Sequence, residues 1–233
     1  MQRRPHPSPI MKQLHDPIDA LWQRLQAARD TRMVIGLVGL PGAGKSTCAQ
    51  QWTRAIHARC AESLMPMAMQ TVGMDGFHLS RAALSQLPDP ELALARRGAE
   101  WTFDPAGLRA RLQALRSRST SGEYAPVSWP GFDHAIGDPV AAALTVEAST
   151  RLVLVEGLYL LLPDADWALK PLFDEVWFLD IDMSQAQEQL IQRHMRAWGW
   201  DHARAQARAQ ASDALNAQRV WATRALADAW VRP

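Results

Sequence analysis

The chain has 233 residues, of which 48% are hydrophobic and 21% are charged, close to the usage of ordinary globular proteins. Its 25 lysines and arginines nearly balance its 24 aspartates and glutamates, so the formal net charge is only +1. These values exclude a disordered charged tail protein and a collagen-like repeat, and they leave no overall basic field that would attract nucleic acid or an anionic membrane. The length predicts one large domain, or one domain with an insertion.

The cysteines and the N-terminus bear on the cellular compartment. Cys48 and Cys60 are too few for a disulfide framework or a four-ligand zinc site, so a reducing, cytoplasmic location is expected. No stretch approaches the ~20 apolar residues of a membrane span. Residues 1–12 are basic and proline-rich but lack the apolar segment of a secretory signal. We expect a flexible tail there, followed by a single domain over residues 13–233.

The predicted elements of the first third alternate between helix and strand. Asp16-Pro17 is typical of a helix start, and apolar residues follow it at helical spacing. The apolar run 33–38 predicts a strand that is buried on both faces. A glycine-rich turn over residues 39–46 leads into a helix over about 47–64, and a second strand is expected over 67–74.

The alternation continues to the end of the chain. A stretch of about 80–125 is expected to be a helical excursion. Strands are predicted over 151–156 and 175–181, with helix over 184–198 and again from about residue 202. Such alternation predicts an α/β fold with a mostly parallel sheet. The Ala/Arg/Gln-rich stretch 203–211 suits a solvated helix without a special function.

A nucleotide-phosphate site is predicted at the first strand-to-helix turn, where the sequence fits G-x-x-x-x-G-K-[ST] between an apolar strand and a helix. Glycines let backbone N–H groups turn inward around an anion, and the helix N-terminus adds partial positive charge. Lys45 is expected to hold the β- and γ-phosphates of ATP, and the Ser46 hydroxyl to ligate Mg²⁺. The alternative is a glycine-rich turn without a ligand. The predicted nucleotide site comprises Gly39, Pro41, Gly42, Ala43, Gly44, Lys45, Ser46 and Thr47.

Acidic residues end three of the predicted strands. Glu156 ends an apolar strand and is a candidate for orienting Mg²⁺, the alternative being a cap for the next turn. Asp180 and Asp182 also follow a strand, but Asp182 is better placed to cap the helix that begins near residue 184. Asp75 follows the second strand.

Asp75 is the candidate base of the reaction. The carboxyl ends of parallel strands converge on the ligand crevice, so its carboxylate is expected near the phosphates, where it can accept the proton of an attacking hydroxyl. The alternative is a turn residue before Gly76. For His78 the alternatives are substrate binding and a loop cap. Phe77 is expected to pack in the protein, and the alternative is an aromatic ring beside the acceptor.

Eight segments carry a resemblance to a known family, over about residues 15–232. They are the phosphate loop, Met-Asp-Gly-Phe-His (74–78), Arg-Arg-Gly-Ala (96–99), Trp-Thr-Phe-Asp (101–104), Phe-Asp-His (132–134), Asp138-Pro139, Val-Glu-Gly-Leu-Tyr (155–159) and Arg193-His194. In these the chain resembles the P-loop kinase family of uridine kinase, phosphoribulokinase and bacterial pantothenate kinase. It is most similar to the branch of nucleoside/nucleotide kinase-like proteins, some described as fructose transport system kinases.

The resemblance implies a fold and a set of roles. The fold is the three-layer α/β/α P-loop NTPase fold, with a mostly parallel five-stranded core sheet, a helical acceptor-side insertion over about 76–140 and a lid over about 184–205. The implied catalytic residues are Asp75, Lys45 and Arg193, and the implied metal ligands are Ser46 and Glu156. The implied substrate contacts are Asp75, Phe77, His78, Arg97, Asp133 and His134. The implied contacts to the nucleotide outside the loop are Arg193, Arg196, Asn216 and Arg224.

One position departs from the family pattern. Gln189 stands where an arginine is expected before the lid, so that either Arg193 suffices or Arg196 substitutes for the missing guanidinium. Arginine suits this task because it stays charged and its planar fork can hold two phosphate oxygens.

The predicted activity is transfer of the γ-phosphate of ATP·Mg²⁺ to a hydroxyl of a small metabolite. A nucleoside and a sugar are equal candidates for the acceptor, and a pantothenate-like acid comes third. The alternatives are a non-catalytic ATP-binding regulator and a GTPase-type switch. A GTPase would need a guanine-binding motif of the Asn-Lys-x-Asp type, and the sequence contains none. No nucleic-acid or membrane partner is expected, and a homodimer is an expectation from family analogy.

Overall fold

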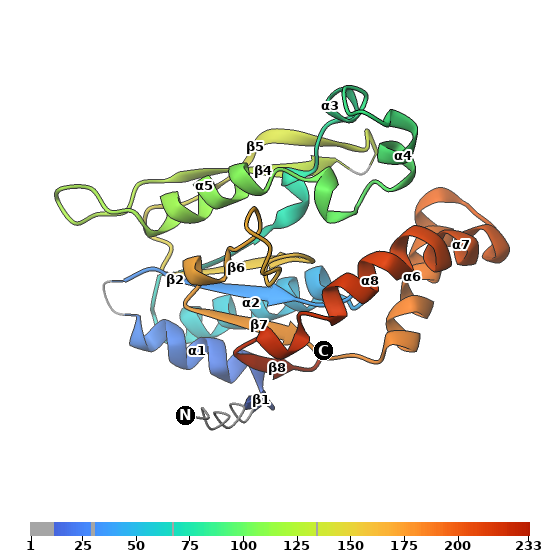
Figure 1. Ribbon diagram of the computed structural model, residues 1–233. Helices are drawn as coiled ribbons and strands as arrows, with labels where there is room; N and C mark the ends of the chain where they lie inside the picture. Colours follow the sequence, from blue (N-terminus) through green and yellow to red (C-terminus); the bar gives the residue numbers. More distant parts are fainter. Residues whose placement is uncertain (1–11, 29–30, 67, 134) are drawn as a thin grey trace, which may run out of the picture.

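A six-stranded sheet in which every strand is parallel to its neighbours forms the centre of the protein (Figure 1). The structure is a computed structural model that describes residues 12–28, 31–66, 68–133 and 135–233. The strand order is β1-β8-β7-β2-β6-β3. The strands span Lys12–Leu14 (β1), Met33–Val38 (β2), Met69–Gly73 (β3), Leu152–Gly157 (β6), Glu175–Leu179 (β7) and Ala229–Val231 (β8).

The apolar runs of the sequence become the central strands. Nearly every residue of β2 and β6 is buried, as expected for strands of a parallel sheet that is covered on both faces. Both strands pair over six residues, from Met33 with Leu152 to Val38 with Gly157. The predicted α/β class with a parallel sheet is therefore confirmed.

The predicted five strands are corrected to six. The edge strands β1 and β8 have three residues each, and β8 lies between β1 and β7. Three residues are too short to show an alternating or apolar pattern, and only pairing across more than 200 positions, as between Lys12 and Ala229, identifies them as strands. Lys12 thus belongs to the sheet, whereas the rest of the predicted tail, residues 1–11, lies outside the described residues.

The first helix begins as the sequence predicts, and the second begins at Lys45, two residues earlier than expected. Helix α1 (Pro17–Ala27) starts at Asp16, whose side chain accepts a 2.9 Å hydrogen bond from the Asp19 N–H. Helix α2 (Lys45–Glu62) follows the glycine-rich turn, and both of its cysteines are buried and free. The later helices are α3 (Arg81–Leu84), α4 (Pro90–Ala95), α5 (Pro105–Arg116), α6 (Met183–Trp198), α7 (His202–Arg208) and α8 (Ala214–Trp221).

The insertion is not purely helical, which corrects the sequence-based expectation for residues 76–140. After α3, α4 and α5 it forms an antiparallel hairpin of β4 (Val127–Asp133) and β5 (Asp138–Val146), separate from the main sheet. Proline and glycine at positions 130 and 131 interrupt the strand pattern of β4, and the register shifts there. Figure 1 shows the insertion, from green to yellow, as a layer on the opposite side of the sheet from α1.

The C-terminal helices stand at the side of the sheet and reach up to the insertion (Figure 1). Helix α7 passes into a π-helical segment, Ala209–Asp213, before α8 begins. Ala205 and Ala209 are buried against Leu190 and Ile191 of α6. The stretch 203–211 is therefore packed on one face, and is not the fully solvated helix that its composition suggests.

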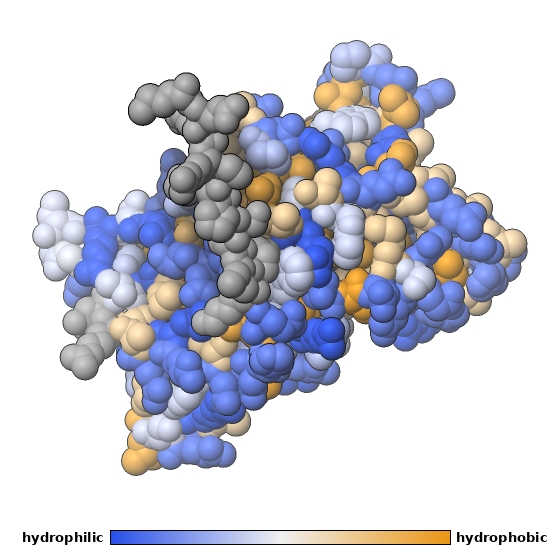
Figure 2. Space-filling model, turned by 60° about the horizontal axis from the view of Figure 1, so that its bottom comes forward, coloured by the Kyte–Doolittle hydropathy of each residue, from blue (hydrophilic) through white to orange (hydrophobic). Residues whose placement is uncertain are grey.

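The surface in Figure 2 is mostly hydrophilic, with hydrophobic residues in separate small groups. Among the described residues, no helix combines the length and apolar character needed to cross a membrane.

Candidate active site

The carboxyl ends of the central strands bring the predicted phosphate loop and two acids together. In the sheet register Glu156 at the end of β6 lies between Leu37 of β2 and Gly73 of β3. The phosphate loop continues from β2, and β3 passes directly into a 3-10 helix η1 (Met74–Phe77) that carries Asp75. The loop, Glu156 and Asp75 therefore share one edge of the sheet, as expected where parallel strands end.

The phosphate loop closes around the side chain of Lys45. The buried ammonium donates hydrogen bonds to the carbonyl oxygens of Gly39 at 2.9 Å and Leu40 at 3.1 Å. Gly42 and Gly44 adopt φ values of 81° and 85°, in the left-handed region that glycine enters without strain. The loop backbone therefore curls before α2 as an anion-binding loop requires, and it holds the lysine inside the curve.

Ser46 and Glu156 form the part of the site that suits a magnesium ion. The Ser46 hydroxyl donates a 2.9 Å hydrogen bond to Glu156 Oε1. No cluster of three or more His, Cys, Asp or Glu side chains with metal-binding geometry occurs among the described residues. Mg²⁺ takes few protein ligands and keeps waters and substrate phosphate oxygens in its shell, so one hydroxyl beside one carboxylate fits it.

Burial and neighbouring charges shift the pKa values of two of these groups. Burial lowers the pKa of Lys45, the carboxylates of Glu156 and Asp75 oppose this shift, and the charge of Arg193 adds to it. Burial and the charge of Asp75 raise the pKa of Glu156, against the opposing effects of Lys45, Ser46 and Arg193. The four charged groups are thus within electrostatic reach of one another, although they come from four separate segments.

Removing the Glu156 charge is expected to stabilise the nucleotide-free protein. Because the folded state raises the Glu156 pKa above its ordinary value of 4.5, the folded chain binds this proton more tightly than the unfolded chain. The free energy of unfolding therefore falls as the pH rises from 4.5 through the folded pKa. Glu156→Gln removes this loss and keeps an acceptor for Ser46, so its unfolding midpoint at pH 7 should rise by a few degrees, at about 2–4 °C per kcal/mol.

Thermal unfolding between pH 4 and 8 tests this expectation. The gain should shrink towards pH 4, where the wild-type carboxyl is protonated as well. A variant that is less stable than wild type at pH 7 would contradict it.

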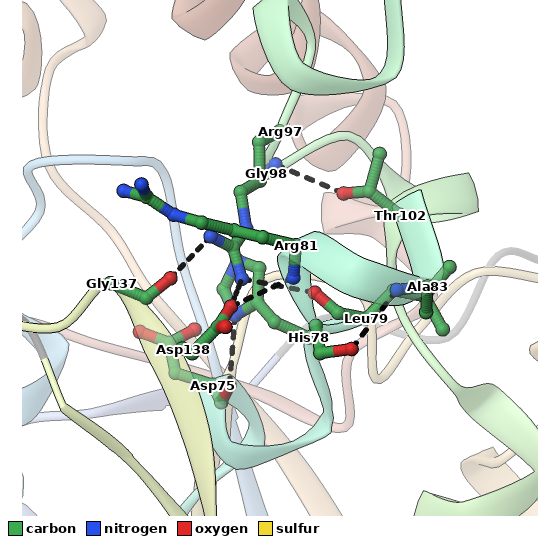
Figure 3. Close-up of polar contacts among 11 residues, drawn as sticks. Asp75, His78, Leu79, Arg81, Ala83, Arg97, Gly98, Thr102, Gly137 and Asp138 are labelled. Carbon is green, nitrogen blue, oxygen red and sulfur yellow. Dashed lines mark hydrogen bonds and ion pairs between the residues drawn. The ribbon is translucent and has the colours of Figure 1, made fainter. Parts of the chain in front are cut away.

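The segment that carries Asp75 is fixed on several sides. A Cβ on Gly76 would overlap the carbonyl group of Pro130, so η1 lies directly against β4. The Trp129 indole N–H donates to the Gly73 carbonyl at 2.8 Å. The Asp75 carbonyl accepts hydrogen bonds from the His78 backbone N–H at 3.1 Å and from His78 Nδ1 at 2.8 Å (Figure 3). The Asp75 residue itself is exposed, which leaves its carboxylate accessible to a substrate.

Other predicted substrate contacts are engaged in contacts within the protein. Phe77 is buried and packs edge-on against Trp129 with ring centroids 5.3 Å apart, as its packing role predicts. Asp133 Oδ1 accepts hydrogen bonds from the backbone N–H groups of Ala135 at 2.7 Å and Ile136 at 3.1 Å, and so shapes the hairpin turn. His134 lies outside the described residues.

Arg97 is engaged within the insertion. Its guanidinium donates to the Gly137 carbonyl, to the Leu79 carbonyl at 2.9 Å and to Asp138 Oδ1 at 2.8 Å (Figure 3). Burial alone would raise the pKa of Asp138, but hydrogen bonds from the Arg81 N–H and from Arg97, with their charges, bring it below its ordinary value. The Arg97 guanidinium is therefore bonded to other residues of the insertion and is not free to bind a substrate.

The predicted lid helix α6 packs on the phosphate loop. A Cβ on Gly42 would overlap the carbonyl oxygen of Ala186 and approach Leu190 Cβ to 2.8 Å. One turn further along α6, Arg193 is exposed, and its positive charge lowers the pKa values of both Lys45 and Glu156. Arg196 instead folds back to the Gln192 carbonyl at 3.2 Å. Of the two predicted lid arginines, only Arg193 shows an influence on the site.

Gly42→Ala is expected to disrupt the contact between α6 and the loop. The new methyl group meets backbone at a positive φ, so we expect a loss of about 1–3 kcal/mol in the free energy of unfolding. Gly44→Ala is the matched control, since it shares the positive φ but meets no atom within 4 Å. Denaturant unfolding of both variants isolates the contact, and equal losses would show that α6 contributes nothing.

Asn216 and Arg224, predicted at the adenine side, make contacts within the protein. Buried Asn216 donates to the Gly98 carbonyl at 3.1 Å and accepts from Arg96 at 3.2 Å. Arg224 donates to Asp180 Oδ1 at 2.9 Å and lies over the Trp230 ring at 3.2 Å. The structure does not bring these two side chains to the loop. Asp182 is the N-cap residue of α6, as predicted, but its side chain makes no capping hydrogen bond.

Two cavities border the C-terminal segments. A cavity of about 70 Å³ lies between the phosphate loop, α6 and α8, with Pro41, Leu190 and Ala217 in its lining. A larger one, of about 430 Å³, is lined by residues 161–163, 168, 170–171 and 225–228. The Asp228 carboxylate accepts a hydrogen bond from Val176 N–H at the beginning of β7, which puts the larger cavity at the amino end of the sheet, away from the phosphate loop.

Two residues without a predicted role, Asp138 and Arg208, hold the segments around Arg97 in place. Asp138 binds both Arg97 and the Arg81 N–H, and Arg208 of α7 donates to the carbonyls of Ala95 at 2.7 Å and Arg97 at 3.2 Å. The only sequence signal for Asp138 is its place in the Asp-Pro pair of the resemblance. Arg208 has no signal, because it is one of several arginines in an alanine-rich helix.

Relatives with kinase names share most of the chain. An Aspergillus versicolor protein named "ATP-dependent kinase-like protein notR'" is 42% identical over 149 residues, 63% of this chain and 86% of that protein. A Schizosaccharomyces pombe protein named "Putative uridine kinase" is 40% identical over 166 residues, 70% of this chain and 67% of that protein. No family model matches the chain.

Solved structures share the fold. The crystal structure of a "putative fructose transport system kinase" from Silicibacter sp. TM1040 has a TM-score of 0.78 at 32% identity, and the match covers 94% of this chain and 100% of that one. The crystal structure of YFH7 from Saccharomyces cerevisiae has the same TM-score of 0.78 at 23% identity over 93% of this chain and 97% of that one, and so bears on the fold alone.

Proposed function

The chain belongs to the P-loop kinases related to uridine kinase, and from that premise we propose that it transfers the γ-phosphoryl group of ATP to a hydroxyl group of a small metabolite, a nucleoside or a sugar. The observation that carries the proposal is the joint position of Lys45, Glu156, Asp75 and Arg193 at the carboxyl edge of the sheet. A phosphate loop alone serves many proteins, but an accessible carboxylate beside it suits a kinase that activates a hydroxyl.

The phosphate loop and the lid helix α6 bind the nucleotide. The backbone N–H groups of residues 39–47 and the N-terminus of α2 receive the phosphates. The Lys45 ammonium, now bonded to two loop carbonyls, exchanges these contacts for phosphate oxygens. Arg193 adds positive charge from α6. Because α6 packs on Gly42 of the phosphate loop, the helix is held beside the phosphates, where it can exclude water.

The acceptor side falls to Asp75. Its carboxylate accepts the proton of the acceptor hydroxyl as that oxygen attacks the γ-phosphorus in line with the leaving ADP oxygen. Ser46 and Glu156 would hold a magnesium ion, Glu156 directly or through water, and the ion would neutralise charge on the phosphate oxygens.

The acceptor class is supported by the names of the relatives. The names "Putative uridine kinase" and "putative fructose transport system kinase" contain a nucleoside and a sugar. Both acceptors offer several hydroxyl groups, and an exposed Asp75 beside the hairpin of the insertion can take either.

A screen of ATP consumption across nucleosides, sugars and pantothenate-like acids tests the proposal, with Asp75→Asn as the blank for each compound. We expect one class to raise ADP formation in the wild type and to give a phosphorylated product by mass spectrometry. Slow hydrolysis with every acceptor would favour a non-catalytic ATP-binding regulator instead.

A further inference from the structure

A continuous set of polar contacts joins the lid helix to the segment that carries Asp75. On α6, His194 directly follows Arg193, and its buried ring bonds through Nε2 to Asp213 Oδ2 at 2.8 Å. The same carboxylate oxygen lies 3.9 Å from Arg208 Nε. The Arg208 guanidinium in turn donates to the carbonyls of Ala95 and Arg97.

The second half of the set starts at the Arg97 guanidinium. It reaches Leu79, four residues after Asp75, and also Gly137 and Asp138 at the hairpin turn (Figure 3). Leu79 follows His78, whose backbone and ring nitrogen both bond to the Asp75 carbonyl. Arg97 thus has its backbone carbonyl held by the C-terminal helices and its side chain bonded to the chain segment of Asp75.

We propose that Arg97 is a positioning residue for phosphoryl transfer, which sets the place of Asp75 and links it through Arg208 to the lid helix. This inference rests on the proposed function. A guanidinium suits the task because its planar fork can satisfy three acceptors at once, whereas an ammonium is a single point charge. A base misplaced by about 1 Å costs on the order of 100-fold in rate, so a rigid support is needed.

The geometry distinguishes this role from a substrate contact. The Arg97 side chain is only 14% exposed, and its guanidinium donates to three acceptors within the protein, the carbonyls of Gly137 and Leu79 and the carboxylate of Asp138. The Ala95 carbonyl is available to Arg208 because α4 ends at Ala95, where the last helical carbonyls lack partners within the helix. Beyond the helix, the Arg97 carbonyl accepts from Arg208, and the Gly98 carbonyl accepts from Asn216 and Tyr159.

The test compares Arg97→Gln and Arg208→Gln with Arg32→Gln. Arg32 is the matched control, since it is a buried arginine that donates to the carbonyls of Leu115, Glu147, Ala148 and Thr150 at the other end of β2.

We expect Arg97→Gln to lower kcat on the order of 100-fold with the KM for ATP within about twofold, and to raise the ratio of ATP hydrolysis to transfer. Arg208→Gln should give a smaller loss in the same direction, and the double variant should be no slower than Arg97→Gln. Arg32→Gln should lose stability alone.

Three outcomes would overturn the inference. An Arg97→Gln variant that loses stability as Arg32→Gln does but keeps kcat and the hydrolysis ratio is structural only. A large rise in the KM for the acceptor with kcat unchanged makes Arg97 a substrate contact. Additive losses in the double variant break the link to the lid helix. If Arg97→Gln does not fold, Arg97→Lys takes its place with the same expected directions.

A readout without turnover separates this inference from the proposed function. If the wild type transfers phosphate to no acceptor, the proposed function fails, and amide hydrogen exchange decides the structural link. Exchange at residues 74–79 should accelerate in the Arg97 and Arg208 variants and stay unchanged in Arg32→Gln. Unchanged exchange in all three would reject the link.

Discussion

Asp75→Asn is expected to lower kcat by about 10²–10⁴-fold, the usual contribution of a general base, while the affinity for ATP stays within about twofold. The amide keeps the size of the carboxyl but cannot take the proton of the acceptor. The fold should survive, because the structural contacts of this segment use the backbone of Asp75 and the side chain of Trp129. Calorimetric titration with ATP and an assay of the phosphorylated product measure the two effects separately.

A second acid in the insertion gives the control. Asp89 caps α4 by accepting a 2.9 Å hydrogen bond from the Leu92 N–H, and asparagine caps helices equally well. Asp89→Asn should therefore keep both stability and kcat. Full transfer activity in Asp75→Asn would remove Asp75 from the role of base, and a large loss of ATP affinity would mean that the carboxylate acts on the nucleotide.

The sequence was sufficient for the centre of the fold because local patterns there have one physical interpretation. Apolar runs such as Met33–Val38 and Leu152–Gly157 form parallel strands, and Gly44-Lys45-Ser46 in register with a helix start forms a phosphate loop. The three-residue edge strands and the hairpin have no such local signature. Their backbone pairs with segments that lie far away in the sequence or contain proline, so only tertiary structure identifies them.

The same distinction applies to the candidate site. Residues of the loop, Asp75 and Glu156 meet because strand ends in a parallel sheet must converge. The partners of an arginine are not encoded near it in the sequence. Arg97 was predicted to contact the substrate, yet it contacts Leu79, Gly137 and Asp138, and Arg208 reaches across more than 100 positions to Ala95. Such long-range contacts depend on how separate segments pack, which a single sequence does not show.

Lys45→Met is expected to lower kcat by at least 10²–10³-fold, about the cost of removing one preorganised charge that stabilises the transition state, and to weaken ATP binding as well. The thioether fills the space of the lysine stem but offers no donor to the phosphates.

Stability should move in the opposite direction from activity in this variant. Because burial lowers the Lys45 pKa below its ordinary value of 10.5, the folded chain binds this proton less tightly than the unfolded chain. The free energy of unfolding therefore rises with pH between the folded pKa and 10.5, and below that window the buried ammonium reduces stability. Lys45→Met removes that cost, although it also loses the two hydrogen bonds to the loop carbonyls.

Lys170→Met supplies the comparison for Lys45→Met. Lys170 also donates to a carbonyl, that of Leu226 at 2.6 Å, and pairs with Asp228 at 2.9 Å, but it lies at the amino end of the sheet. Its loss should leave transfer unchanged, since exposed ion pairs contribute about 0–1 kcal/mol and this one is remote from the phosphates. If both lysine variants lost stability alike and Lys45→Met kept its rate, the ammonium would serve only to close the loop. Loss of transfer in Lys45→Met with stability retained would instead mean that the loop holds its lysine ready for the nucleotide.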